Sequence, residues 1–242
     1  MEQEKMGTDA ITDFLAVSLS STDYVGHQFG PNSIEVEDTY LRLDRELAAF
    51  LSYLDAKVGK GQYLFFLTAD HAVAHNPRFM EENKLPVKPL KSIMSELKAA
   101  VKEKFNIANV IADADNYQIY LNDKAIDSAG VSREDVKAFM IKRLNLVPEM
   151  LIAFDNEEIS EVNLPTEVKE KFLKGYNTKR GGDIQMVLKA GYFFGSGDFT
   201  GSTHGAWYPY DSHIPLLWMG WGIKSGKSNT TRTHPQQRNM RV

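Results

Sequence analysis

Residues 63–71 read Tyr63-Leu64-Phe65-Phe66-Leu67-Thr68-Ala69-Asp70-His71. Their apolar run, preceded by Gly59 and Gly61, predicts a strand that is buried on both faces. The strand leads directly to Asp70 and His71. Open α/β sheets place their ligand sites at the carboxyl ends of strands. A carboxylate oxygen and an imidazole nitrogen together suit zinc or a similar divalent metal.

A second stretch has the same design. Residues 13–19, Asp13-Phe14-Leu15-Ala16-Val17-Ser18-Leu19, again predict a buried strand, and small hydroxyl residues lead from it to Asp23 and His27. These two residues are four apart, so one loop or helical turn can direct both to one ion. An Asp-His pair alone is common in proteins that bind no metal. Two strands that each end in Asp plus His predict a metal site.

Apolar residues recur every three or four positions from Val36 to Val58 and predict a long amphipathic helix over 34–57. The order strand, helix, strand over 13–68 is typical of a parallel, right-handed βαβ unit. Parallel pairing would place both Asp-His motifs at the same edge of the sheet. The predicted fold class is therefore α/β, a mostly parallel sheet with flanking helices.

The region 90–190 has a different rhythm and is predicted to be an inserted α+β subdomain without a cluster of ligand residues. Its predicted strand 117–121 should not pair with residues 14–19 or 64–67. The predicted division is therefore a metal-binding α/β core in residues 1–89 and 191–223, the inserted subdomain in 90–190, and a polar tail in 224–242 that is expected to be disordered.

Composition excludes several classes of function. The chain has 242 residues, a formal charge of −4 and a pI near 5.9, which give no electrostatic case for nucleic-acid binding. It has no cysteine, so disulfides and thiolate metal sites are excluded. No apolar run approaches the ~18–20 residues of a membrane span. The first residues lack the apolar core of a signal peptide.

Three motifs in order resemble the alkaline phosphatase superfamily. Residues 21–27 (Ser-Thr-Asp-Tyr-Val-Gly-His), with Gly30-Pro31 after them, resemble its second metal motif. Residues 67–71 (Leu-Thr-Ala-Asp-His) resemble the next motif, and Thr203-His204-Gly205, before residues 210–215, resembles the last one. The most similar branch is that of the PafA-like bacterial alkaline phosphatases and the type I phosphodiesterase–nucleotide pyrophosphatases. The resemblance extends from about residue 7 to 223.

The resemblance implies two zinc ions that clamp the attacking and leaving oxygens of phosphoryl transfer. Asp23, His27 and His204 would hold the first ion, and Asp70 and His71 would belong to the second. His213 remains open as a rival to His204. The family's Thr or Ser nucleophile comes from an earlier strand, so we expect it upstream of Met1, with this chain as an incomplete, C-terminal portion of the fold.

The function implied is a zinc-dependent phosphate monoester hydrolase, an alkaline phosphatase acting on small phosphate monoesters. The resemblance also implies a periplasmic or secreted location. Two alternatives remain open at this point. One is a phosphodiesterase or nucleotide pyrophosphatase of the same superfamily, because the metal motifs do not separate monoesterases from diesterases. The other is a catalytically inactive metal-binding fragment, because no nucleophile is recognised among these residues.

Overall fold

The computed structural model describes residues 1–85, 92–194 and 201–230. The chain divides into two compact units. Unit 1 comprises residues 1–25, 34–70 and 214–242, and unit 2 comprises residues 26–33 and 71–213. Of the predicted tail, residues 224–230 have no regular secondary structure, and residues 231–242 lie outside the described residues. The predicted division into core and inserted subdomain differs from these bounds and stays a prediction.

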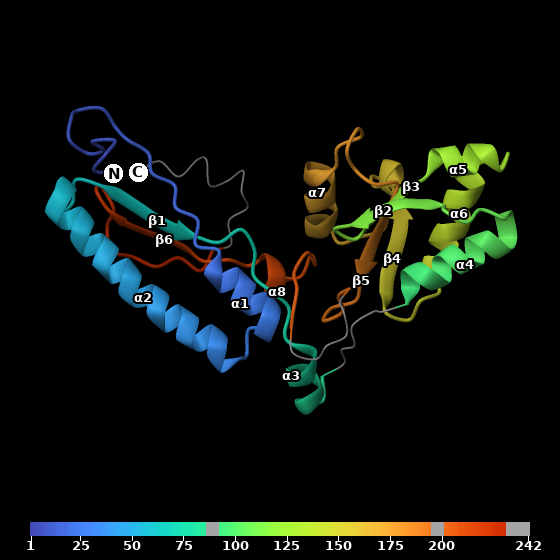
Figure 1. The fold of residues 1–242 in the computed structure, drawn as a ribbon, viewed down its shortest axis with the longest axis horizontal. Coiled ribbons are helices and arrows are strands. Elements are labelled where there is room, and N and C mark those ends of the chain that lie inside the picture. The colour runs from blue at the N-terminus through green and yellow to red at the C-terminus, as the bar shows by residue number, and fades with distance from the viewer. Residues whose placement is uncertain (86–91, 195–200, 231–242) are drawn as a thin grey trace. The chain divides into compact units, whose positions relative to one another are not determined.

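Figure 1 labels the helices and strands. Helix α1 (Ser21–Phe29) contains the boundary between the units. Unit 1 contains α2 (Ile34–Leu54), the π-helical turn η1 (Asp55–Gly59), β1 (Leu64–Thr68) and β6 (Leu216–Gly220). Unit 2 contains α3 (Pro77–Glu82), α4 (Ile93–Phe105), β2 (Ile111–Asp115), β3 (Gln118–Leu121), α5 (Asp123–Ser128), α6 (Arg133–Leu144), β4 (Met150–Asp155), the 3-10 turn η2 (Asn156–Glu158), α7 (Thr166–Gly175), β5 (Ile184–Leu188) and α8 (Pro209–Ser212). Among the described residues, no helix is both long and apolar enough to cross a membrane.

Helix α2 follows the periodic apolar pattern, so this prediction is confirmed. Val36 and Leu54 are buried, and Leu43, Leu47 and Phe50 between them are half-buried. The spacing of three or four residues puts these side chains on one face. After Leu54 the helix continues as η1, which ends at Gly59 with a left-handed φ.

Strand β1 forms where it was predicted, but it pairs antiparallel with β6, with Leu64 opposite Gly220 and Thr68 opposite Leu216 (Figure 1). Leu64 is 39% exposed and Phe66 is 43% exposed, so the prediction of a strand buried on both faces is wrong. The reason is that successive side chains of a strand point to opposite faces. In the part of the chain that the structure describes, this sheet has two strands and one face remains open.

The stretch 13–19 forms no strand in the structure, and this prediction is also wrong. Phe14 is 75% exposed and Val17 is 60% exposed. An apolar run alone does not make a strand, because its backbone groups also need a neighbouring strand to bond. The predicted parallel βαβ unit is therefore not formed, and the pairings between described strands are all antiparallel.

Unit 2 is built on a four-stranded antiparallel sheet in the order β2-β3-β5-β4. Strand β3 pairs with β2 and β5, so the prediction that 117–121 pairs with neither 14–19 nor 64–67 is confirmed. Helices α4 and α6 lie beside the sheet (Figure 1) and contribute buried residues to its core, among them Val101, Val136 and Met140, each 0% exposed. A core of this kind can hold the loops around it in fixed positions.

One ion pair is buried inside unit 2. Lys137 on α6 is 3% exposed, and its Nζ lies 2.6 Å from Asp155 Oδ2 and 3.0 Å from Glu134 Oε2. Burial by itself lowers the pKa of Lys137, but hydrogen bonds to Asp155 and Glu134 outweigh it, so the pKa is raised. A raised pKa means that the pair stabilises the fold fully below the unfolded-state pKa of about 10.4 and loses this effect as the pH rises through the folded-state pKa. The pair is therefore intact at neutral pH.

We expect Asp155→Ala to destabilise unit 2 by roughly 3–5 kcal/mol, because it leaves the Lys137 ammonium buried without its main partner. The double variant Lys137→Met/Asp155→Asn should recover much of this loss, since it removes both buried charges and keeps an N-cap for η2, where Asp155 accepts from the amide of Glu157. Urea unfolding followed by the fluorescence of Trp207, which packs against Phe172 in unit 2, measures the change.

The matched control is the exposed ion pair Arg78–Glu82 on α3, with a distance of 3.0 Å between Nε and Oε1. Its side chains are 70% and 61% exposed, so Glu82→Ala should cost no more than about 1 kcal/mol. Replacing Trp218 and Trp221 by Phe leaves Trp207 as the sole fluorescent indole in all variants. Equal effects of Asp155→Ala and Glu82→Ala would contradict the assignment of a buried pair.

Candidate metal centre

Helix α1 presents the first two candidate ligands. Asp23 lies in its first turn and His27 in its last turn. Residues four apart lie on the same face of a helix, one turn above the other. The sequence left open whether a loop or a helical turn joins Asp23 to His27, and in the structure a helix joins them. Both side chains come from one helix, so no loop separates them in the sequence.

Two hydrogen bonds join the end of α1 to the loop that carries the third candidate ligand. The amide of Ser202 donates to the carbonyl oxygen of His27 at 3.1 Å. The Nδ1 atom of His27 lies 3.0 Å from the carbonyl oxygen of Ser202 and donates to it in the tautomer that this contact favours. The close approach requires a glycine before Ser202, because a Cβ at Gly201 would lie 2.6 Å from the His27 carbonyl oxygen.

The same loop is fixed on its other side by the segment after His71. The hydroxyl of Ser202 donates to the carbonyl oxygen of Ala74 at 2.5 Å, and the amide of Ala74 donates to the carbonyl oxygen of Thr203 at 3.1 Å. Ser202 is 7% exposed and Ala74 is 2% exposed. The backbone directly before His204 is therefore held by buried hydrogen bonds.

The three predicted ligands of the first ion lie together. Asp23, His27 and His204 each offer one ligand atom, and these atoms lie within 4.8 Å of one another. A bond from Nδ1 to a backbone carbonyl leaves the lone pair of a neutral imidazole on Nε2, the usual arrangement of a metal-binding histidine. Two imidazole nitrogens and one carboxylate oxygen are a donor set that fits zinc with an open fourth position.

Asp70 and His71 follow the end of β1, as predicted. His71 stacks on His204, with ring centroids 3.4 Å apart and planes inclined by 13°. Its Nδ1 lies 2.8 Å from the carbonyl oxygen of Ala72. In residues 1–85, 92–194 and 201–230, Asp70 and His71 join no third His, Asp or Glu in a ligand cluster. His71 therefore brings the pair next to His204, but Asp70 and His71 alone do not make a complete second metal site.

The sequence did not point to Asp211, a residue that is only 3% exposed. The amide of Ala206 donates to its Oδ2 at 2.6 Å, and the amide of Ala72 donates to its carbonyl oxygen at 2.7 Å. Burial raises the pKa of Asp211. The bond to Ala206 and the nearby His204 and His71 act in the opposite direction, but burial has the larger effect and the pKa is raised. Asp211 thus fixes the turns after both histidines. Its place within residues 210–215, which follow the His204 motif in the family resemblance, was the available signal.

His213, the rival third ligand, is exposed at the end of α8. It is absent from the ligand cluster that contains His204. This arrangement favours His204 over His213 as the third ligand.

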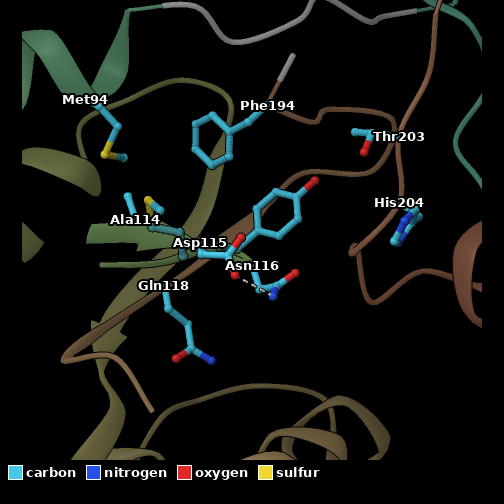
Figure 2. A pocket seen from close by; sticks show the side chains of 10 residues that line it. Met94, Ala114, Asp115, Asn116, Gln118, Phe194, Thr203 and His204 are labelled. Atoms are coloured by element: carbon cyan, nitrogen blue, oxygen red, sulfur yellow. Dashed lines mark hydrogen bonds between the residues drawn. The ribbon is translucent and has the colours of Figure 1, made fainter. Parts of the chain in front are cut away.

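A cavity of about 340 Å³ opens beside His204 within unit 2. Figure 2 shows Met94 and Phe194 on one side of it and Thr203 and His204 across from them. A site of this size accommodates a small molecule.

Comparisons with known proteins find a matching family and several similar proteins. Residues 2–207 match the family described as type I phosphodiesterase / nucleotide pyrophosphatase. The chain is 50% identical to the alkaline phosphatase PafA of Elizabethkingia meningoseptica over 95% of its own length and 42% of the relative. It is 47% identical to the alkaline phosphatase PhoV of Synechococcus elongatus over 93% of its length and 40% of the relative.

The crystal structure of wild-type PafA superposes on this chain with a TM-score of 0.91 at 50% identity. The match covers 95% of this chain and 44% of the PafA chain. The expected α/β fold class is thereby confirmed. The chain spans less than half of the length of these relatives.

We expect Gly201→Ala to weaken zinc binding by about 10–100-fold, the usual effect of disturbing groups that orient a metal ligand. Its Cβ would force the Ser202 backbone away from the carbonyl oxygen of His27 and so displace His204. Competition with a chromophoric zinc chelator measures the affinity.

The control is Gly175→Ala at the end of α7, where a Cβ meets no described atom within 4 Å. It should leave zinc affinity unchanged. Wild-type affinity of Gly201→Ala would show that the contact between α1 and the loop does not position the ligands.

Proposed function

The chain belongs to the type I phosphodiesterase / nucleotide pyrophosphatase family, and from this premise we propose that it is the metal-binding portion of a zinc-dependent phosphate monoester hydrolase. The observation that carries the proposal is the cluster of Asp23, His27 and His204 in a fold that matches an alkaline phosphatase. The substrates would be small phosphate monoesters. The expected periplasmic or secreted location remains a prediction.

When bound, zinc would supply Lewis-acid stabilisation of the oxygens in phosphoryl transfer. The residues of this chain would bind and orient it. Asp23 would contribute the negative charge, and the two imidazoles would complete a set of three protein ligands. Ser202 would fix the ring of His27, and the stacked ring of His71 would restrict His204. Such support is what keeps a metal site in one geometry.

Asp70 and His71 would belong to a second zinc site. Their position directly after β1 and the contact of His71 with His204 support this assignment. Two protein ligands bind a metal weakly, so this second site would need further ligands for full occupancy. The proposed number of zinc ions, two, therefore rests on the family resemblance.

The chain by itself is proposed to be a weak catalyst. Covalent phosphoryl transfer needs an activated hydroxyl nucleophile. The hydroxyl of Thr22 donates to the carbonyl oxygen of Leu19 at 3.2 Å, and that of Thr68 donates to the carbonyl oxygen of Pro215 at 2.9 Å. Both hydroxyls are thus engaged with the backbone. Their roles are to bond turns near the ligands.

A phosphodiesterase or nucleotide pyrophosphatase activity is the second candidate, and the description of the matching family favours it. Parallel assays of p-nitrophenyl phosphate and bis-p-nitrophenyl phosphate distinguish the two activities. A metal-binding module without catalysis is the third candidate, and it predicts zinc binding without turnover of either ester, even in a longer chain.

We expect Asp23→Ala, His27→Ala and His204→Ala each to lower zinc affinity by more than about 100-fold, because each removes a direct ligand from a set of three. Metal content after dialysis, measured by mass spectrometry, reports the loss. His213→Ala is the control and should retain zinc, since His213 is exposed outside the cluster. Loss of zinc in His213→Ala with retention in His204→Ala would reverse the assignment of the third ligand.

We expect p-nitrophenyl phosphate turnover by the zinc-loaded chain to fall on the order of 10⁶ below that of full-length PafA, the typical cost of losing a covalent nucleophile. The measurement uses alkaline pH, added zinc and protein made in a host without its own phosphatase. His204→Ala serves as the background control. Turnover within tenfold of PafA would show that these 242 residues already contain the catalytic groups.

A further inference from the structure

The cavity beside His204 is lined by an unusual turn. Strands β2 and β3 are joined by the two residues Asn116 and Tyr117, whose φ angles are 48° and 62°. Two-residue hairpin turns of this type favour glycine at the second position. A tyrosine there is strained, and strain of this kind tends to be kept where a side chain has a task.

The fold holds Tyr117 in this conformation from several sides. Its carbonyl oxygen accepts hydrogen bonds from the Met186 amide at 2.8 Å and from Gln185 Nε2 at 3.0 Å. Gly205, with a φ of 106°, lies against its ring, and a Cβ there would come within 2.8 Å of Tyr117 Cε2. These contacts hold the ring of Tyr117 beside Gly205, the residue that follows His204.

The cavity presents aromatic and thioether surface. The rings of Tyr117 and Phe194 have centroids 5.4 Å apart with planes inclined by 38°, and Met94 and Met186 also line the cavity. Burial raises the pKa of the Tyr117 hydroxyl, so this wall is uncharged at neutral pH. Aromatic rings and methionine sulfur both attract a further flat ring.

Polar groups lie at the same cavity. Asn116 Nδ2 donates to Asp115 Oδ2 at 2.9 Å, shown as a dashed line in Figure 2. A carboxylate there disfavours an anionic ring by like-charge repulsion. On the facing side lies His204, a proposed zinc ligand. An aromatic group in the cavity would therefore be near a phosphoryl group bound at the metal.

We propose that this cavity binds the uncharged aromatic leaving group of a phosphate ester and so gives the chain a preference for aryl and arylmethyl esters. Tyr117 and Phe194 would be specificity-determining residues that touch the ring. The inference rests on the proposed function, since it assumes that a phosphoryl group is bound beside His204.

Benzylphosphonate and cyclohexylmethylphosphonate test the proposal, because they differ in the aromaticity of the ring and not in the phosphorus group. They are titrated into the zinc-loaded chain, in which methionine carries ¹³C-labelled methyl groups. We expect benzylphosphonate to bind about fivefold to tenfold more tightly. It should shift the methyl signals of Met94 and Met186, while those of Met140 and Met150 in the core stay in place.

Phe194→Leu should abolish the preference for the aromatic ring. Phe139→Leu is the matched control, since Phe139 packs against Phe105 and does not line the cavity. Tyr117→Gly provides a second variant, because glycine relieves the left-handed φ while removing the ring. Both cavity variants should bind the two phosphonates with equal affinity.

Equal binding of the two phosphonates by the wild-type chain would overturn this inference and leave the proposed function intact. Failure to bind zinc would instead contradict the proposed function. The cavity is then tested with benzyl alcohol against cyclohexylmethanol through the same methyl signals. Selective shifts of Met94 and Met186 with benzyl alcohol would support the aromatic site, and their absence would overturn it.

Discussion

The paired hydrogen bonds between His27 and Ser202 are the interaction on which the candidate metal centre depends. They join residues 175 positions apart in the sequence and bring a loop to the end of α1. The helix alone offers Asp23 and His27, which are too few ligands for a stable zinc site. The loop adds His204 only because Gly201 lets the two backbones approach closely. Gly201 thus allows His204 to join Asp23 and His27 in a set of three candidate ligands.

The buried carboxylate of Asp211 has the same consequence on the other side of His204. A carboxylate costs free energy when it leaves water, and this cost is only partly offset by its bond to the amide of Ala206 and by nearby histidines, so the pKa of Asp211 remains raised. The buried Asp211 carboxylate therefore restrains the turn after His204 through its bond to the amide of Ala206. His71 is restrained by the same residue, because the amide of Ala72 donates to the Asp211 carbonyl oxygen.

Local features could be predicted from the sequence, and long-range pairing could not. The apolar face of α2 arises from neighbouring residues, and it formed as expected. The partner of β1 is β6, roughly 150 residues away, and no local pattern encodes that pairing. The spacing of Asp23 and His27 predicted two of the three candidate ligands. His204 followed from the family resemblance, and Asp211 was missed because one buried acid has no periodic signature.

The two units differ in how firmly they can hold a ligand. Unit 2 has residues such as Val101 and Ile184 at 0% exposure, whereas β1 and β6 of unit 1 expose apolar side chains. His27, His71 and His204 all belong to unit 2, and their hydrogen bonds and ring contacts lie within it. Asp70 instead follows a strand of a two-stranded sheet, which is only marginally stable by itself. A metal bound through the unit 2 histidines would therefore be held more firmly than one that relied on Asp70.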